Sequence, residues 1–277
     1  MNGIWKVCFL LVASSARLQG AVVPPAEQGN VEYHVYQTQI GKNLPGGREG
    51  VYVYTPPGYD PRSSETYPVL YLLHGFDQNA LSWQTQGDAQ HIIDELISQG
   101  KARPMIVVMP FSYGDYEFFR SGEAVWLLPR RINENVDLFS QMLLSEIIPR
   151  VERSYRVSRR REDRAIAGLS MGGREAISIG LENPSKFAWI GGFSAAFPDY
   201  ERDPFAHMMT KPEKLRLVWI ACGTEDQYFL FKQNMRLIAD LTQEGLPVTP
   251  VVTHGIHGWP VWQRDLAQFV PLLFQSN

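Results

Sequence analysis

The chain has 277 residues, of which 44% are hydrophobic and 12% aromatic, enough to bury a sizeable core and to exclude a disordered protein. Its formal net charge of −3 provides no basic footprint, so nucleic acid is not expected as a main partner. The two cysteines, Cys8 and Cys222, are too few for a disulfide framework or a cysteine-based metal site.

The first residues of the chain resemble an export signal. Lys6 precedes an apolar run over residues 7–13, and small residues suited to cleavage follow it. The run is too short to span a bilayer, so it predicts no membrane anchor. We therefore expect a signal peptide over residues 1–21, a linker over 22–30, a secreted or periplasmic protein, and one domain over 31–277.

Short apolar or alternating segments, separated by turn residues, run through this domain and alternate with amphipathic helical patterns. Strands are predicted at 31–40, 50–54, 67–73, 105–109, 164–169, 187–193, 217–222 and 248–253. Helices are predicted at 88–98, 135–155, 174–181, 226–244 and 259–274. The first two strands suggest a hairpin at the sheet edge. The rest predict an α/β protein with a doubly wound, mostly parallel sheet and helices on both faces.

The stretch AIAGLSMGG at residues 165–173 combines a buried strand, a serine between two glycines, and the start of a helix. This is the context of a nucleophile elbow, a strained turn that lifts a serine hydroxyl above the sheet. Side chains at Gly168 or Gly172 would collide with the neighbouring strand and helix. The pattern makes Ser170 a candidate nucleophile, and the amide of Met171, at a helix N-terminus, a candidate oxyanion donor.

An activated serine needs a base, and with this elbow the chain order is serine, acid, histidine. His207 lies in a polar loop with no strand to hold it, whereas His254 and His257 follow the last predicted strand. We favour His257 as the base because it lies deeper in that loop, directly before the last helix.

The acid should follow an earlier strand, and residues 217–222 are followed by Gly-Thr-Glu-Asp. Glu225 and Asp226 both remain candidates from the residues alone, with Asp226 preferred by spacing; a cap of the next helix is the alternative role of Asp226. A second oxyanion donor should follow a central strand. The strand at 67–73 runs into His74–Gly75, so we predict the amide of Phe76, with His74 as an orienting residue rather than a base.

Five blocks in this order resemble the esterase-D-like branch of the α/β-hydrolases, closest to feruloyl and acetylxylan esterases. The blocks are LLHG at 72–75, PMIVVMP at 104–110, RAIAGLSMGG at 164–173, CGTED at 222–226 and HGWPVW at 257–262. The resemblance implies an α/β-hydrolase fold, with Ser170 as nucleophile, Asp226 as acid and His257 as base. It places the oxyanion amides at Met171 and Phe76.

The resemblance further implies a serine carboxylesterase acting on feruloyl or acetyl esters of plant cell-wall polysaccharide, without cofactor or metal. Residues 111–133, which have no clear period, are expected to border the acyl pocket. Trp83, Tyr113, Trp126 and Trp259 are candidate substrate-binding aromatics, with Trp262 beside them, although core packing is an alternative for each. A small-acyl esterase, an acyltransferase of the same fold and a non-catalytic carbohydrate-binding module are the alternative functions. No nucleic acid or membrane partner is expected, and the oligomeric state is left open.

Overall fold

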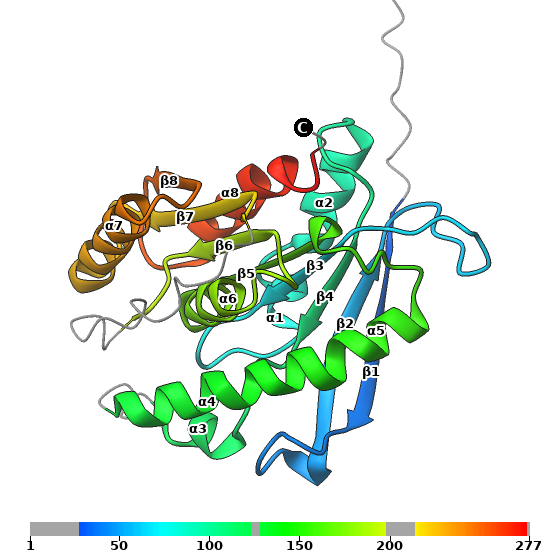
Figure 1. Ribbon diagram of the computed structural model, residues 1–277, viewed down its shortest axis with the longest axis horizontal. Helices are drawn as coiled ribbons and strands as arrows, with labels where there is room; N and C mark the ends of the chain where they lie inside the picture. Colours follow the sequence, from blue (N-terminus) through cyan, green and yellow to red (C-terminus); the bar gives the residue numbers. More distant parts are fainter. Residues whose placement is uncertain (1–27, 123–127, 198–213, 276–277) are drawn as a thin grey trace, which may run out of the picture.

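The computed structural model describes residues 28–122, 128–197 and 214–275, with the side chains of residues 129 and 228 left aside. One eight-stranded sheet runs through these residues in the order β1-β2-β4-β3-β5-β6-β7-β8 (Figure 1). The strands are β1 (Asn30–Gln37), β2 (Arg48–Thr55), β3 (Val69–Leu73), β4 (Ile106–Pro110), β5 (Arg164–Leu169), β6 (Trp189–Phe193), β7 (Leu217–Gly223) and β8 (Val248–Thr253). From β4 to β8 every neighbouring pair is parallel, which confirms the mostly parallel sheet.

Helices cover both faces of this sheet. They are α1 (Ser82–Thr85), α2 (Ala89–Ser98), α3 (Tyr116–Arg120), α4 (Pro129–Met142), a π-helical turn (Leu143–Ile147), α5 (Ile148–Ser154), α6 (Ser170–Glu182), α7 (Tyr228–Gln243) and α8 (Trp259–Phe269). Figure 1 shows α4 and α5 crossing one face, while α2 and α8 lie on the other. Along β3, Tyr71 belongs to the core under α4 to α7, and Leu72 belongs to the core under α1, α2 and α8. Successive residues of a central strand thus point into two different cores, one on each face of the sheet. This explains why the central strands are uninterrupted apolar runs in the sequence.

The order of the central strands sets where a ligand can bind. The chain passes from β3 to β4 on one side, then returns to place β5 on the other side of β3. Ligands of open α/β sheets bind outside the carboxyl ends of the strands at such a reversal. Here that point lies between the residues that follow β3, beginning at His74, and the residue that follows β5, Ser170.

The predicted hairpin is confirmed, because β1 pairs with β2 antiparallel at the edge of the sheet. The approach to β1 is fastened to α2 by Asp94, whose carboxylate accepts hydrogen bonds from the Gly29 amide (3.1 Å to each oxygen) and from the Tyr54 hydroxyl (2.6 Å). Within the described ranges, no helix is long and apolar enough to cross a membrane. The predicted signal peptide over residues 1–21 lies outside the described residues.

The long helix predicted from residue 135 starts earlier than expected, at Pro129. Proline is favoured in a first helical turn because its φ is already helical, and Arg130 pairs with Glu134 one turn later at 2.8 Å. The first two turns are largely polar, so the apolar period did not reveal them. The same helix widens into a π-helical turn before Pro149. Proline has no backbone N–H to donate to the carbonyl one turn earlier, so the regular α-helical hydrogen bonding is interrupted there.

Candidate active site

Ser170 lies between the end of β5 and the first turn of α6 in a strained backbone conformation, with φ of 51°. A non-glycine residue in this left-handed region signals a conformation that the surrounding structure enforces. A Cβ atom at Gly168 would strike the backbone of Gly172, and one at Gly172 would strike the carbonyl of His74. The two flanking glycines therefore let β5, α6 and the loop after β3 meet around the serine, as the sequence predicted.

The structure brings Ser170, His257 and Asp226 together although they are far apart in the chain. The Nε2 atom of His257 lies 3.0 Å from the Oγ atom of Ser170. The Nδ1 atom of the same ring lies 3.0 and 3.1 Å from the two carboxylate oxygens of Asp226. This is the geometry of a serine, a base within hydrogen-bond reach and an acid that orients the base.

Two loops that bond side by side hold the acid and the base in place. The amide of Thr224 donates to the Thr253 carbonyl at 2.8 Å, and the amide of Glu225 donates to the Gly255 carbonyl at 2.9 Å. Gly255 has φ of 136°, a region open to glycine, so the loop after β8 turns tightly against the loop after β7.

These contacts distinguish the residues that the sequence left open. The side chain of Glu225 is exposed, whereas that of Asp226 is buried against His257. His254 is exposed, and its Nδ1 atom lies 3.3 Å from the hydroxyl of Thr224. The third candidate base, His207, lies outside the described residues.

The carboxylate of Asp226 is buried yet stays in its charged form. Burial on its own would raise the pKa of Asp226, but the hydrogen bond and the charge of His257, followed by the Ser194 hydroxyl and the Gln227 amide, bring it below the ordinary value of 3.8. The Gln227 amide donates to Oδ1 at 2.7 Å, and the Cys222 thiol lies 3.7 Å from Oδ2. An ionised carboxylate next to the imidazole favours the histidine cation that forms when a serine loses its proton.

The loop after β3 passes directly beside the serine. A Cβ atom on Gly75 would lie 3.4 Å from the Cβ atom of Ser170, so the Gly75–Phe76 backbone borders the same space as the serine hydroxyl. The side-chain oxygen of Gln78 accepts from the Gly75 amide at 2.9 Å and shapes the loop. Met171 follows Ser170 in the first turn of α6, where amides have no acceptor within the helix.

His74 is a buried, neutral part of this loop. Its Nδ1 atom lies 2.8 Å from the Gly75 carbonyl, which only accepts, and its Nε2 atom accepts from the Ser112 amide at 3.1 Å. These partners place the ring proton on Nδ1. Burial lowers the pKa of His74 to about 4, so the ring stays uncharged at neutral pH. The side chain therefore has the orienting position predicted for it.

Two of the predicted substrate-binding aromatics are core residues, so those predictions are wrong. Trp83 has no exposed surface, packs against Phe193 and Trp259, and donates from its indole to the Leu73 carbonyl at 2.9 Å. Tyr113 is also fully buried, and its hydroxyl accepts from the Asp77 amide at 2.9 Å. Both side chains hydrogen-bond to the end of β3 or to the loop after it, and neither ring has exposed surface that a ligand could contact.

The remaining predicted aromatics differ in position. Trp259 is partly exposed and packs edge-to-face on Trp262, which in turn packs edge-to-face on His257 with ring centres 4.9 Å apart. Trp126 lies outside the described residues. The described part of 111–133 does approach the serine, because Phe118 and Tyr113 pack with Met171 and Phe76 in one small apolar cluster.

Sequence reasoning missed two buried carboxyl groups, one in the helix that begins at Ser170 and one that interacts with Asp226. Glu175 lies one turn after Ser170, and its Oε1 atom accepts from the Asn135 amide at 3.3 Å; burial raises its pKa well above the ordinary value. Asp265 in α8 accepts from the Thr253 hydroxyl at 2.7 Å. Neither residue belongs to a motif, and the only local signal is a charged residue inside an apolar helical stripe.

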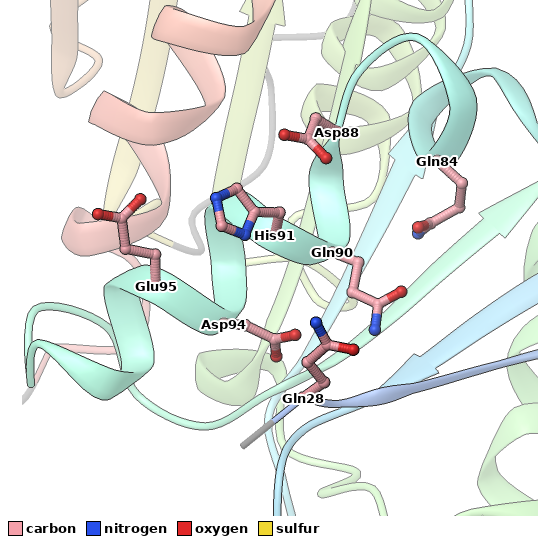
Figure 2. A pocket seen from close by; sticks show the side chains of 7 residues that line it. All are labelled: Gln28, Gln84, Asp88, Gln90, His91, Asp94 and Glu95. Atoms are coloured by element: carbon pink, nitrogen blue, oxygen red, sulfur yellow. The ribbon is translucent and has the colours of Figure 1, made fainter. Parts of the chain in front are cut away.

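A different hollow, of about 550 Å³, runs along α2 (Figure 2). Its walls are Gln28, Gln84, Asp88, Gln90, His91, Asp94 and Glu95. None of these belongs to the Ser170 cluster, and the buried carboxylate of Asp94 is already engaged by Gly29 and Tyr54. Across the described residues, no group of three or more His, Cys, Asp or Glu side chains has a metal-binding arrangement. We therefore place the candidate active site at Ser170.

Comparison with known proteins shows which family this fold belongs to. The Esterase family model matches residues 42–273. An endo-1,4-beta-xylanase/feruloyl esterase of Xylanibacter ruminicola is 28% identical over 92% of this chain, which spans about a third (34%) of that relative. An acetyl esterase of Caldicellulosiruptor saccharolyticus is 26% identical over 74% of this chain and 82% of its own length.

Solved structures show the same architecture. A ferulic acid esterase of Anaeromyces mucronatus superposes with a TM-score of 0.78, covering 95% of this chain and 96% of that one at 23% identity. The strand order, the serine at the end of β5 and the family match agree with each other. The chain belongs to the Esterase family and has the α/β-hydrolase fold.

Proposed function

We propose that this protein hydrolyses feruloyl or acetyl esters of plant cell-wall polysaccharide through a covalent acyl-enzyme on Ser170. The observation that carries the proposal is the continuous contact from Ser170 Oγ through the His257 ring to the Asp226 carboxylate. The cell-wall substrate is supported by the named activity of the Xylanibacter relative. Export of the protein stays part of the proposal, supported by Lys6 and the apolar run at 7–13.

The proposed reaction passes two protons in turn through His257, the first from Ser170 and the second from a water molecule. The ring takes the proton from Ser170 as the serine oxygen attacks the ester carbonyl, and Asp226 stabilises the resulting cation. His257 then gives the proton to the leaving alcohol. A water molecule, deprotonated by the same ring, attacks the acyl-enzyme, and the proton returns to the Ser170 oxygen as the acid leaves.

The negative oxygen of each tetrahedral intermediate needs hydrogen-bond donors beside Ser170. We assign this role to the amides of Met171 and Phe76, because the helix start and the Gly75–Phe76 backbone both border Ser170. Each such donor contributes about 3–4 kcal/mol to transition-state stabilisation in comparable sites. We assign Trp259 to the border of the acyl site, since it is the partly exposed aromatic two residues from His257.

The test compares initial rates on methyl ferulate and p-nitrophenyl acetate, using the wild-type chain and Ser170→Ala. We expect release of ferulate and of methanol in equal amounts, and loss of both activities in the variant. Acetate turnover without ferulate turnover would leave the serine chemistry standing and reject the feruloyl substrate. Less free acid than alcohol would indicate acyl transfer. Activity that survives in Ser170→Ala would reject the proposed nucleophile.

A further inference from the structure

A second hollow, of about 260 Å³, lies between β1 and α5. β1 is the edge strand of the sheet, and β2, β4 and β3 separate it from β5, which leads into Ser170. His34 and Tyr36 of β1 form one wall, and Arg150, Arg153 and Tyr155 of α5 and its end form another. In Figure 1 this is the region where α5 crosses the first two strands. None of its lining residues takes part in the proposed reaction.

The arginines of this hollow differ from their neighbours in the chain. Residues 150–164 contain seven arginines in a protein whose net charge is −3. Arg164 and Arg159 both lie within 4 Å of the Glu152 carboxylate, and the arginines at 160 and 161 are similarly paired with carboxylates. Arg150 and Arg153 have no carboxylate within that distance among the described residues. The positive charge of the hollow is therefore not neutralised by an ion pair of the fold.

Arg150 is held in a fixed position. Its guanidinium lies 4.8 Å from the centre of the Tyr36 ring, and its Nη2 group donates to the Gln37 carbonyl at 3.0 Å. Its Nε–H is buried, and no acceptor for it exists in the part of the chain that the structure describes. The Arg150 side chain as a whole is partly exposed, so an anion bound there would supply the charged partner that the described residues do not.

The carboxylates nearest to the hollow do not fill this role. Glu32 accepts from the Tyr155 hydroxyl at 3.1 Å and lies 3.5 Å from His34, so its partners are two other lining residues of the hollow and not the arginines. Glu49 faces Tyr36 across the hairpin, and burial raises its pKa well above the ordinary value, which favours its neutral form. Among the described residues, neither carboxylate forms an ion pair with Arg150 or Arg153.

We propose that this hollow binds the carboxylate of an acidic sugar unit. Ligand sites for drug-sized molecules usually measure about 300–1,000 Å³, so a hollow slightly below this range suits a single sugar ring. Guanidinium groups match a carboxylate, while the aromatic side chains of Tyr36 and Tyr155 in the lining add apolar surface for a sugar ring. The site would hold an acid-bearing polysaccharide during ester hydrolysis, a role that rests on the proposed function, whereas binding itself does not.

The first experiment measures binding, not turnover. Isothermal titration of the full chain with glucuronate, glucose and inorganic phosphate is compared for wild type, Arg150→Gln/Arg153→Gln and Arg62→Gln/Arg130→Gln. The last pair removes the same charge from two highly exposed positions elsewhere. We expect glucuronate to bind at least tenfold more weakly to the first variant alone, and glucose and phosphate to bind more weakly than glucuronate to wild type.

Equal loss of glucuronate binding in both double variants, or no binding to wild type, would overturn the proposal. Phosphate that binds as tightly as glucuronate would overturn the sugar assignment and indicate a simple anion site. Arg153→Gln alone provides a second variant, because the Arg153 side chain is exposed and makes no described hydrogen bond whose loss would affect folding. Turnover of p-nitrophenyl acetate should be unchanged in every variant, which separates this test from that of the proposed function.

Discussion

Replacing Asp265 by asparagine removes a buried carboxyl group of α8 that interacts with Asp226. Burial, with a smaller contribution from the Asp226 charge, raises the pKa of Asp265 from its ordinary 3.8 to about 7, against the opposing effects of the Thr253 hydrogen bond and Arg264. The folded protein therefore keeps a proton that the unfolded chain releases near pH 4. The contribution of Asp265 to stability is fully present below that pH and is lost as the pH rises through about 7.

The size of this effect follows from the two pKa values. One pKa unit corresponds to about 1.4 kcal/mol, so a difference of about three units costs about 4 kcal/mol over the whole range, of which about 2–3 kcal/mol falls between pH 5 and 8. Asparagine keeps the acceptor for the Thr253 hydroxyl and does not ionise. Urea unfolding of wild type and Asp265→Asn at pH 5, 6, 7 and 8 measures the difference between the two profiles.

We expect the wild type to lose stability relative to Asp265→Asn as the pH rises across this range. Asp226 does not disturb the comparison, because its pKa is lowered and its contribution disappears only in acid, below its ordinary value of 3.8. Asp137→Asn, at an exposed position of α4, is the matched control and should follow the wild-type profile. Parallel profiles for wild type and Asp265→Asn would refute the reasoning.

Four further changes test the site and its scaffold. Asp226→Asn should lower kcat for p-nitrophenyl acetate about 10,000-fold with little change in KM, because it removes the charge that orients His257; a loss below tenfold would contradict this role. Gly172→Ala should destabilise the fold by about 1–3 kcal/mol in urea unfolding, since its methyl group meets the loop after β3, while Gly258→Ala meets only ordinary contacts at 3.9 Å and should be nearly neutral. Trp83→Ala should cost about 3–5 kcal/mol of stability as a core residue. Trp259→Ala should mainly raise KM for methyl ferulate relative to p-nitrophenyl acetate, and an equal rise for both esters would speak against an acyl-site position.

The sequence predicted the strands and the serine turn well where the pattern depends on neighbouring residues alone. The strand at 164–169 and the strand at 248–253 match β5 and β8 residue for residue, because turn or polar residues bound a short stretch rich in apolar residues in both cases. The steric need for Gly168 and Gly172 was also readable, since the elbow requires the same close approach wherever it occurs. The start of α4 at Pro129 was missed, because its first turns have a polar surface.

Other features depended on which distant residues meet. Sequence spacing left both Glu225 and Asp226 as candidates for the acid. Only the pairing of the loops after β7 and β8 buries Asp226 against the ring of His257. An aromatic side chain has the same local signature in a core as at a ligand site. Trp83 and Trp259 are thus alike in sequence, but packing leaves one buried and the other partly open.

The arginines of residues 150–164 show the same division. Their number is visible in the sequence, but whether each guanidinium meets a carboxylate depends on how α5 lies across β1 and how the following turn folds back. The sequence by itself determined the order of strands and helices and the residue types of the candidate site, because short-range periodicity and steric demands encode them. Only the tertiary structure decided which side chains touch and which charges stay unpaired, because contacts between distant segments are set by sheet register and helix packing.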